Sequence, residues 1–441
     1  MKRLLSLLLC AVLALFCATT AQAAGVSITL TASEYALHYA FDAGAQDPFV
    51  ILEYATPAEK GWMMLYSADG HFEGDVSLAY SGAGGKTTVT LTSARTTGSI
   101  GKTSRTLPKA ADYQKPTGKS NAKVTDFVLT ETPEGFHYAF NAAGTDYMLL
   151  YWRSKEQTVT QPVYPDENGH YEGDVISDLT FARTQFTVQV KSGSGSMKKE
   201  ATVRKGYQAP EAPQRQEGRL SGVTVCIDAG HQENGRFVNE PIGPGLSGST
   251  SGKGGMAQGT KTNRRESIVC LEIGMLLRDE LLRQGANVIM TREDQTTFHT
   301  NIERCEIAEA GGAQIMLRLH CNNSSNRSKR GIQVYGPLNS DYAKAVADAD
   351  TYREMGQKLL DAMKTRVGMT LANSTGMVRL NDNYVGNNWA KMMCFLVEMG
   401  YLSNPAEEYL LVTPVYQQWL AEGMADGVYE IAVARGWVQA Q

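Results

Sequence analysis

The fold of the C-terminal half is decided by the run Val223-Thr224-Val225-Cys226-Ile227-Asp228-Ala229-Gly230-His231-Gln232. Its first five residues are mostly β-branched and carry no charge, which is typical of a strand buried on both faces. The strand then ends at a small, flexible pair, Ala229-Gly230, and presents His231. Because ligands bind beyond the carboxyl ends of parallel strands in open α/β sheets, we expect His231 to lie at such a site. A histidine that bonds only to loop backbone is the alternative.

Two further segments carry groups that suit the same site. The apolar run at residues 313–319 leads directly to His320, and Glu266 heads a segment with apolar residues at helical spacing. Two imidazoles and one carboxylate form the donor set of a catalytic zinc site that keeps one position open for water. Glu266 has an alternative role, because Asn263 followed three residues later by a glutamate also fits a helix capping box.

A third buried strand is expected at residues 391–397 and ends at Glu398. A carboxyl group at the end of a buried strand is desolvated, which raises its pKa and suits a group that first accepts and later donates a proton. We therefore predict Glu398 as the catalytic base and acid. A solvated glutamate at a strand end is the alternative.

Four segments carry a family resemblance: DAGHQ at 228–232, RRESIVCLEIGMLLRDELLRQGANVIMTRED at 264–294, NIERCEIAEAGGAQIMLRLHCN at 301–322 and FLVEMGYLSNPAEE at 395–408. In this order they resemble the zinc-dependent N-acetylmuramoyl-L-alanine amidases of the third amidase family, over about residues 219–438. The resemblance implies a Zn²⁺ cofactor held by His231, Glu266 and His320, with Glu398 as the catalytic carboxylate. It also implies cleavage of peptidoglycan at the amide between N-acetylmuramic acid and L-alanine of the stem peptide.

Two alternatives to this function remain. One is a zinc peptidase that acts on the stem peptide, and the other is a non-catalytic wall-binding or adhesion protein with a degenerate amidase domain. The chain also departs from the family pattern at Ala229, where many members have proline, and at Arg318, where many have serine. The segment 232–265 is longer than the connection common in the family, so the shape of the substrate groove is not implied by the resemblance.

Length and charge set further bounds. With 441 residues the chain is too long for one ordinary core, so we expect two or three domains. A formal net charge of -4 and a pI near 6.0 provide no basic surface field, which argues against nucleic acid as the main partner. The oligomeric state is not indicated.

The amino terminus has the pattern of a secretory signal peptide. Lys2 and Arg3 precede the apolar run 4–16, and Ala21-Gln22-Ala23 is a small-residue cleavage site, so residues 1–23 are the predicted signal. No small residue precedes Cys10 or Cys17, as a lipid anchor would require. We expect a secreted bacterial protein, extracellular or associated with the wall, without a membrane anchor after cleavage.

The remaining five cysteines lie in the C-terminal part and have no repeating spacing. Four of them occupy apolar strand or helix patterns, so we expect buried free thiols and no disulfide framework. Cys321 adjoins His320, and strand alternation predicts that its thiol points away from the metal.

Residues 24–117 and 118–204 alternate apolar and polar side chains between frequent turn signals, which predicts two small β-sandwich modules. The second module repeats the first after 99 positions, as His38 and His137 illustrate. Each resembles the immunoglobulin or fibronectin-like modules of exported bacterial proteins, which implies spacing or wall attachment. Four histidines recur in register, namely His38, His71, His137 and His170. This recurrence favours cross-strand packing; paired metal sites with Glu73 and Glu172 are the alternative.

A proline-bearing linker is expected at 205–218, followed by a catalytic domain at 219–438. In that domain strands and helices alternate, which predicts an α/β fold with a mostly parallel sheet flanked by helices. The expected strands are 223–228, 287–291, 314–320, 332–336, 376–380 and 392–397, and the expected helices are 266–284, 300–310, 341–366 and 415–435.

Two loops of this domain are candidates for lining the groove. The segment 232–262 is rich in glycine, serine and proline, which is typical of a mobile surface loop or of a flap over a cleft. The loop at 381–389 is predicted to form another part of the groove. We predict Asn322, Arg379 and Trp389 as substrate contacts.

Overall fold

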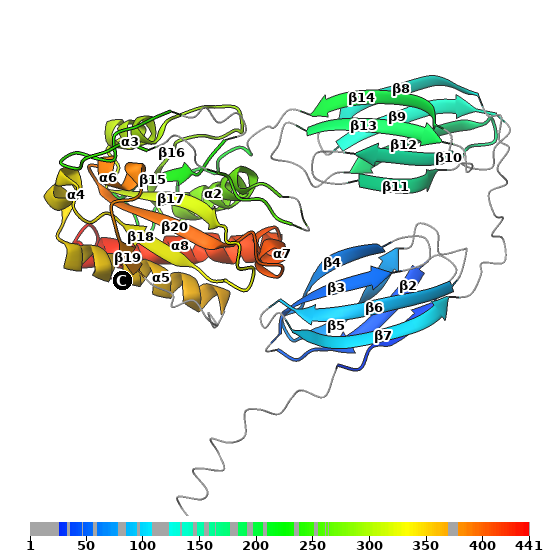
Figure 1. Cartoon of the computed structure of the whole chain (residues 1–441), viewed down its shortest axis with the longest axis horizontal. Helices are drawn as coiled ribbons and strands as arrows, with labels where there is room; N and C mark the ends of the chain where they lie inside the picture. Colours follow the sequence, from blue (N-terminus) through cyan, green and yellow to red (C-terminus); the bar gives the residue numbers. More distant parts are fainter. Residues whose placement is uncertain are drawn as a thin grey trace, which may run out of the picture. The chain divides into compact units, whose positions relative to one another are not determined.

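The structure of the protein is a computed structural model (Figure 1). It describes residues 26–32, 36–45, 47–55, 60–77, 85–94, 98–107, 123–132, 135–143, 148–153, 158–163, 165–176, 184–191, 197–205, 210–232, 238–250, 255–260, 262, 264–368 and 378–440. The predicted signal peptide lies outside these residues. Contacts divide the chain into two compact units, Met1–Lys115 and Pro116–Gln441.

The first β module is built from two antiparallel sheets. One has the order β1 (Thr29–Ala32), β2 (Ala36–Asp42) and β5 (His71–Ser77), and the other has the order β4 (Lys60–Tyr66), β3 (Phe49–Ala55), β6 (Gly85–Ser93) and β7 (Ser99–Leu107). Side chains of both sheets, among them Phe41, Leu52 and Leu91, meet in one buried cluster. The module is therefore sandwich-like.

The second β module has the same sheet plan. The order β12 (His170–Ile176), β9 (Gly135–Ala142) and β8 (Val124–Thr132) forms one sheet, and β11 (Thr158–Val163), β10 (Met148–Arg153), β13 (Thr184–Lys191) and β14 (Met197–Lys205) form the other. An aromatic pair recurs at corresponding places: Phe41 stacks on Phe72 at 4.9 Å between ring centroids, and Phe140 stacks on Tyr171 at 4.6 Å. The assignment to immunoglobulin or fibronectin-like folds and the domain boundaries remain predictions.

The C-terminal domain is organised around one six-stranded sheet. Its order is β16 (Asn287–Met290), β15 (Thr224–Ala229), β17 (Ile315–Asn322), β20 (Met393–Tyr401), β18 (Gln333–Gly336) and β19 (Val378–Leu380). The first four strands are parallel, while β18 runs antiparallel to β20. The mostly parallel sheet that the sequence predicts is therefore confirmed, and the carboxyl ends of β15, β17 and β20 lie together.

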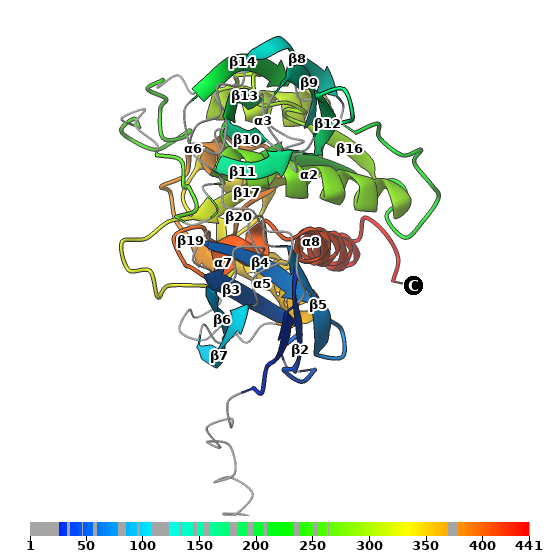
Figure 2. The ribbon, with the colours of Figure 1, turned by 90° about the vertical axis from the view of Figure 1, so that its right-hand side faces the viewer.

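Helices cover both faces of this sheet (Figures 1 and 2). They are α2 (Glu266–Arg283), α3 (Asn301–Ala310), α4 (Asp341–Val346), α5 (Ala349–Val367), α6 (Val385–Trp389), α7 (Glu407–Leu411) and α8 (Pro414–Ala434). Helices α2 and α5 both contact α8 and the sheet, and α3 packs with Cys305 against Cys226, Met316 and Cys394. None of the described helices combines the length and apolarity needed to cross a membrane.

The prediction of one helix at 341–366 is wrong, because the structure has two helices there, α4 and α5. Ala347 has extended backbone angles, and the Asp348 side chain accepts a hydrogen bond from the backbone N–H of Thr351. An aspartate in this position is a helix N-cap, so the chain starts a new helix there. The short helices α6 and α7 were not predicted.

The five described cysteines are buried and free, which confirms the expectation from their apolar surroundings. Burial raises the pKa of the Cys321 thiol well above its ordinary value. That thiol interacts with Cys270 of α2.

Candidate active site

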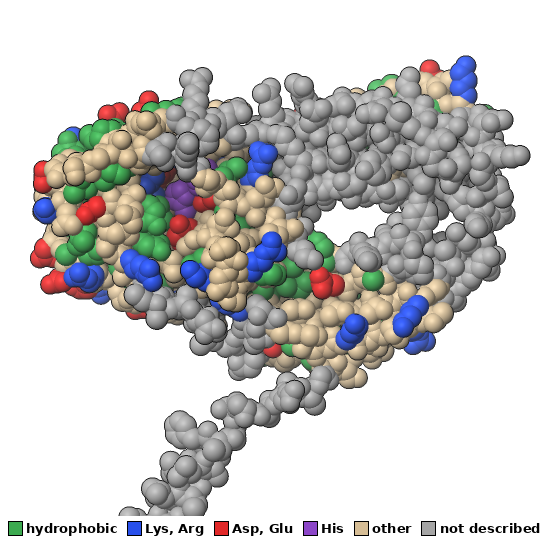
Figure 3. All heavy atoms as spheres, in the orientation of Figure 1, with side chains coloured by type: hydrophobic (Ala, Val, Ile, Leu, Met, Phe, Trp, Pro, Cys, Tyr) green, Lys and Arg blue, Asp and Glu red, His purple; other side chains and the backbone are tan. Residues whose placement is uncertain are grey.

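A cavity of about 1020 Å³ lies at the carboxyl ends of β15, β17 and β20. Its lining includes His231, Glu266, His320 and Glu398. Figure 3 shows histidine and acidic side chains together in a hollow of the C-terminal domain. This volume lies at the upper end of the range of about 300–1,000 Å³ that is typical of ligand-binding pockets.

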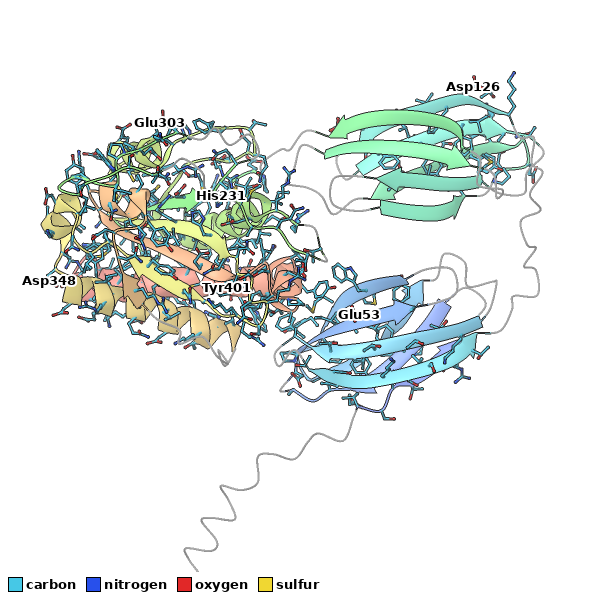
Figure 4. All side chains as sticks on the ribbon, in the orientation of Figure 1. Glu53, Asp126, His231, Glu303, Asp348 and Tyr401 are labelled. Atoms are coloured by element: carbon cyan, nitrogen blue, oxygen red, sulfur yellow. The ribbon has the colours of Figure 1, made fainter. Side chains whose placement is uncertain are left out.

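The chain turns at His231, which follows β15 after the single residue Gly230 (Figure 4). Its φ of 58° is a left-handed conformation that is uncommon for a residue with a side chain. The preceding Gly230 is required by close packing: a Cβ there would lie 2.5 Å from the Leu319 carbonyl oxygen and 2.6 Å from the His320 imidazole. The flexible pair noted in the sequence thus lets two strands bring their histidines together.

His320 and Glu398 come from neighbouring parallel strands. They are direct partners in the register of β17 and β20, so both side chains leave the sheet at the same level. Glu266 comes from the third element, as the first residue of α2. With His231 after β15, four separate segments therefore contribute to the lining of the cavity.

The two histidines converge on one carboxylate oxygen. Glu266 Oε1 lies 3.1 Å from His231 Nε2 and 3.0 Å from His320 Nδ1. One nitrogen or oxygen atom from each of the three side chains lies within 4.8 Å of the others. Ligands of a tetrahedral zinc ion, each at about 2.0–2.2 Å from the metal, are on the order of 3.3 Å apart, so the set fits zinc with little movement.

The protonation states also fit a divalent cation. Burial would raise the pKa of the Glu266 carboxyl, but the charge and hydrogen bond of His231 and the hydrogen bond of His320 hold that pKa well below its usual range. Burial lowers the pKa of His320, although its hydrogen bond to Glu266 opposes this. An ionised carboxylate and a neutral imidazole are the forms that bind metals.

The capping-box alternative for Glu266 is wrong. The residue that caps α2 is Arg265, without a side-chain cap bond, and Glu266 is the first helical residue instead of the third. Its carboxylate points away from the helix start and accepts hydrogen bonds from the backbone N–H groups of Ala257, at 2.7 Å, and Cys321, at 3.1 Å. These bonds fix the carboxylate between the histidines.

Glu398 differs from Glu266 in its surroundings. Its Oε2 atom is shielded from solvent and has no hydrogen-bond partner in the described part of the chain. Burial, reinforced by repulsion from the Glu266 charge, raises the pKa of Glu398 well above its ordinary value. Glu398 is thus part-buried at the cavity wall with one shielded carboxylate oxygen, which suits a group that exchanges a proton.

The three predicted substrate contacts are placed differently. Asn322 lines the cavity and donates a hydrogen bond to Gln333 at 3.1 Å. Among the described residues, the cavity lining includes neither Arg379 nor Trp389. Trp389 instead donates its indole N–H to the Pro241 carbonyl at 2.9 Å, while the loop before it contributes residues 382–385 to the lining.

A buried ion cluster behind His231 was not predicted. Asp228 is fully buried and pairs with Arg304 and with Arg318, whose Nε lies 2.9 Å from the carboxylate. Burial alone would raise the pKa of Asp228, but the two guanidinium groups hold it far below its usual range. A charged residue inside each of two apolar strand patterns is the sequence signal for such a pair.

Two buried arginines also hold the turn that carries His231. Arg292 donates to the carbonyl oxygens of Ala229, at 2.7 Å, and Gly230, at 2.9 Å. Arg304 donates to the carbonyls of Ala229, at 2.9 Å, and His231, at 3.2 Å. Three successive carbonyls are thus bonded to guanidinium groups, which stabilises the left-handed turn.

Comparison with known proteins relates the C-terminal domain to amidases. Residues 225–430 match the family model described as N-acetylmuramoyl-L-alanine amidase. The chain is 26% identical over 231 residues to the germination-specific N-acetylmuramoyl-L-alanine amidase of Bacillus subtilis, covering 49% of this chain and 83% of that relative. It is 27% identical over 218 residues to the probable cell wall amidase LytH of Staphylococcus aureus, covering 48% of this chain and 60% of that relative.

Among solved structures, the chain resembles the N-acetylmuramyl-L-alanine amidase Ami1 of Mycobacterium abscessus, with 19% identity and a TM-score of 0.43, over 48% of this chain and 99% of the other. The segment matched by the family model contains the cavity, both histidines and both glutamates. The match over residues 225–430, together with the relatives of that name, supports N-acetylmuramoyl-L-alanine amidase activity for the C-terminal part of this chain.

Proposed function

We propose that the protein is a secreted, zinc-dependent peptidoglycan hydrolase that cleaves the amide between N-acetylmuramic acid and L-alanine of the stem peptide. His231, Glu266 and His320 hold the zinc ion. The observation that carries this proposal is the convergence of three ligand atoms within 4.8 Å, beside a desolvated glutamate, inside the segment that matches the amidase family.

Zinc bound by these residues would supply a Lewis acid that polarises the scissile carbonyl and lowers the pKa of a water molecule. The chain prepares the site by keeping Glu266 ionised and His320 neutral. The backbone N–H groups of Ala257 and Cys321 hold the carboxylate, so the ligands are oriented before the cation arrives.

Glu398 moves the proton. Its Oε2 atom, which has no protein partner among the described residues, takes the proton of the attacking water. Burial and the Glu266 charge raise the pKa of Glu398, which favours its protonated form, and this carboxylic acid donates the proton to the leaving amine. The products are the lactyl carboxylate of the sugar and a stem peptide with a free L-alanine amine.

The remaining parts of the chain serve this reaction in the proposal. The predicted signal at residues 1–23 exports the protein, and the two β modules space the enzyme from the wall or attach it there. Asn322, at the cavity wall, binds a polar group of the substrate.

The test is fragment analysis of digested wall. Purified full-length protein is incubated with peptidoglycan, with and without a zinc chelator, and the soluble products are analysed by mass spectrometry. We expect intact stem peptides that begin with L-alanine, and their loss with chelator because the Lewis acid is removed.

Two results would overturn the proposal. Shortened stem peptides, with the sugar amide intact, would identify a peptidase. An unchanged wall at full zinc occupancy would identify a non-catalytic wall-binding protein. Restoration of cleavage by added zinc is the control for damage by the chelator.

A further inference from the structure

Residues 238–250 of the long connection form a compact loop that is closed by its own hydrogen bonds. The backbone N–H of Thr250 donates to the Glu240 carbonyl at 2.9 Å, and that of Ile242 donates to the Gly248 carbonyl at 3.1 Å. Ile242 and Leu246 line the cavity together with Val238. We call this segment the wall loop, because it forms one side of the cavity.

The wall loop is bonded to neighbouring helices at its carbonyl groups. Trp389 of α6 donates to Pro241, and Asn388 donates its amide to Ile242 at 3.1 Å. At the start of α4, the Asp341 N–H donates to the Pro244 carbonyl at 3.0 Å. These bonds hold residues 241–244 of the wall loop against α4 and α6.

Glu240 fixes the inner part of the wall loop to α3. It is 5% exposed, and its Oε1 accepts from the Ile302 N–H at 2.8 Å. Its Oε2 accepts from the Asn301 side-chain amide at 2.7 Å and from the Asn301 N–H at 3.2 Å. A buried carboxylate thus satisfies the first N–H groups of the helix, where its charge also interacts favourably with the helix dipole.

Asn301 contacts both Glu240 of the wall loop and Arg318 of the buried ion cluster. While its amide nitrogen donates to Glu240, its Oδ1 accepts from the Arg318 guanidinium at 2.7 Å. Arg318 pairs in turn with Asp228. Asn301 is therefore a relay whose donor faces the wall loop and whose acceptor faces the buried ion cluster.

Arg304, one turn further along α3, contacts both the buried ion cluster and the turn at His231. It pairs with Asp228 and donates to the His231 carbonyl at 3.2 Å and to the Gln232 side chain at 2.5 Å. The position of α3 therefore affects both the wall of the cavity and the turn that presents the first histidine.

We propose that Glu240 and Asn301 are positioning residues that couple the wall loop to His231 through Arg318, Asp228 and Arg304. Loss of the Glu240–Asn301 bond loosens the wall against which substrate binds and the turn that places a metal ligand. The expected change in KM rests on the proposed zinc amidase function. Zinc affinity, in contrast, is measured without any enzymatic activity.

The test compares full-length Glu240→Gln with the wild type in two measurements. A glutamine keeps the shape of the side chain, but its amide nitrogen presents a donor where Glu240 presents an acceptor to α3. We expect KM on wall substrate to rise about 10-fold and zinc affinity, measured on zinc-free protein by competition with a chromophoric chelator, to fall about 10-fold. The turnover number changes less than KM, because Glu398 is untouched.

Glu303→Gln is the matched control. Glu303 is also a carboxylate at the start of α3, where it accepts from the Thr300 N–H at 2.7 Å, but it is exposed and lies outside the connection (Figure 4). We expect it to leave KM and zinc affinity within about twofold of wild type, because exposed caps contribute only to local helix stability.

The double variant E240Q/N301D separates coupling from misfolding. The carboxylate introduced at position 301 accepts from the amide introduced at position 240 and still accepts from Arg318, so the bond is rebuilt with donor and acceptor exchanged. We expect KM and zinc affinity to return to within about threefold of the wild-type values. Equal behaviour of E240Q and E303Q, or no recovery in a folded double variant, would overturn the inference. A wild type that binds no zinc would instead overturn the proposed function.

Discussion

In the C-terminal cavity, His231 and His320 both approach one oxygen of Glu266, whose side chain is 4% exposed. In the first β module, His38 and His71 approach different oxygens of Glu73, whose side chain is 58% exposed. The second module has the same arrangement around Glu172. Two histidines and a glutamate therefore occur together in three described places, with different geometry in the cavity and in the modules.

The difference comes from where the backbone places the groups. In the three-stranded sheet of the first module, Glu73 of β5 is opposite Ala40 of β2, while His71 is opposite Asp42. The His71 Nδ1 lies 2.7 Å from Asp42, so this imidazole has a cross-strand acid in addition to Glu73. Pairs of opposite charge on neighbouring strands stabilise a sheet, which favours the cross-strand interpretation for the modules.

In the cavity the three groups come from two strand ends and a helix start, and buried backbone groups aim them at one point. Donor identity is therefore not sufficient for a metal site. Burial, convergence on one atom and a rigid surrounding shell distinguish the cavity from the modules.

The largest expected effect separates the two kinds of cluster directly. His231→Ala or His320→Ala should abolish both zinc binding and wall cleavage, because each removes a ligand. Glu73→Gln and Glu172→Gln should leave both unchanged. Elemental analysis measures the zinc content of each variant, and turnover on purified wall measures its cleavage activity. Retention of one zinc per chain in His231→Ala would disprove the ligand assignment.

A smaller effect is expected from Glu398→Gln. The variant keeps the three ligands and the shape of the cavity but has no group to exchange the proton, so turnover should fall about 10²–10⁴-fold with zinc content unchanged. Near-normal cleavage by this variant would show that another group is the base.

Gly230→Ala should have an intermediate effect on the metal. The added Cβ meets the His320 ring and the Leu319 carbonyl, so zinc affinity should fall about 10–100-fold. Gly173→Ala is the matched control, because its Cβ would meet only the end of the Tyr138 side chain, at 2.7 Å. Equal zinc affinity in the two variants would show that the packing of Gly230 does not control the ligands.

The smallest expected effect lies in the first module. The hydrogen bond and charge of Asp42 raise the pKa of His71, so this pair stabilises the module fully below pH 6.5 and progressively less as pH rises through the raised pKa. Asp42→Asn should lower the pKa of His71, as measured by NMR titration at low salt. An unchanged titration would show that the pair does not form in solution.

The chemistry of the cavity could be predicted because each group follows an apolar run. His231, His320 and Glu398 stand where buried strands end, a position that periodicity and composition reveal. The sheet and most of its helices followed from the same signals.

The supporting contacts could not be predicted. Glu240 lies in a loop without periodicity, and Asn301 was only an ordinary helix-start residue until its two partners were located. Arg318 and the long connection were each recognised as departures from the family pattern. That one asparagine joins them depends on tertiary packing, which sequence spacing does not encode.

The central claim is that one zinc ion is held in the cavity and none in the β modules. Anomalous diffraction at the zinc edge, from crystals of the full-length zinc-loaded protein, tests it most directly. We expect a single strong peak within bonding distance of His231, Glu266 and His320. A peak at Glu73 or Glu172, with none in the cavity, would contradict it.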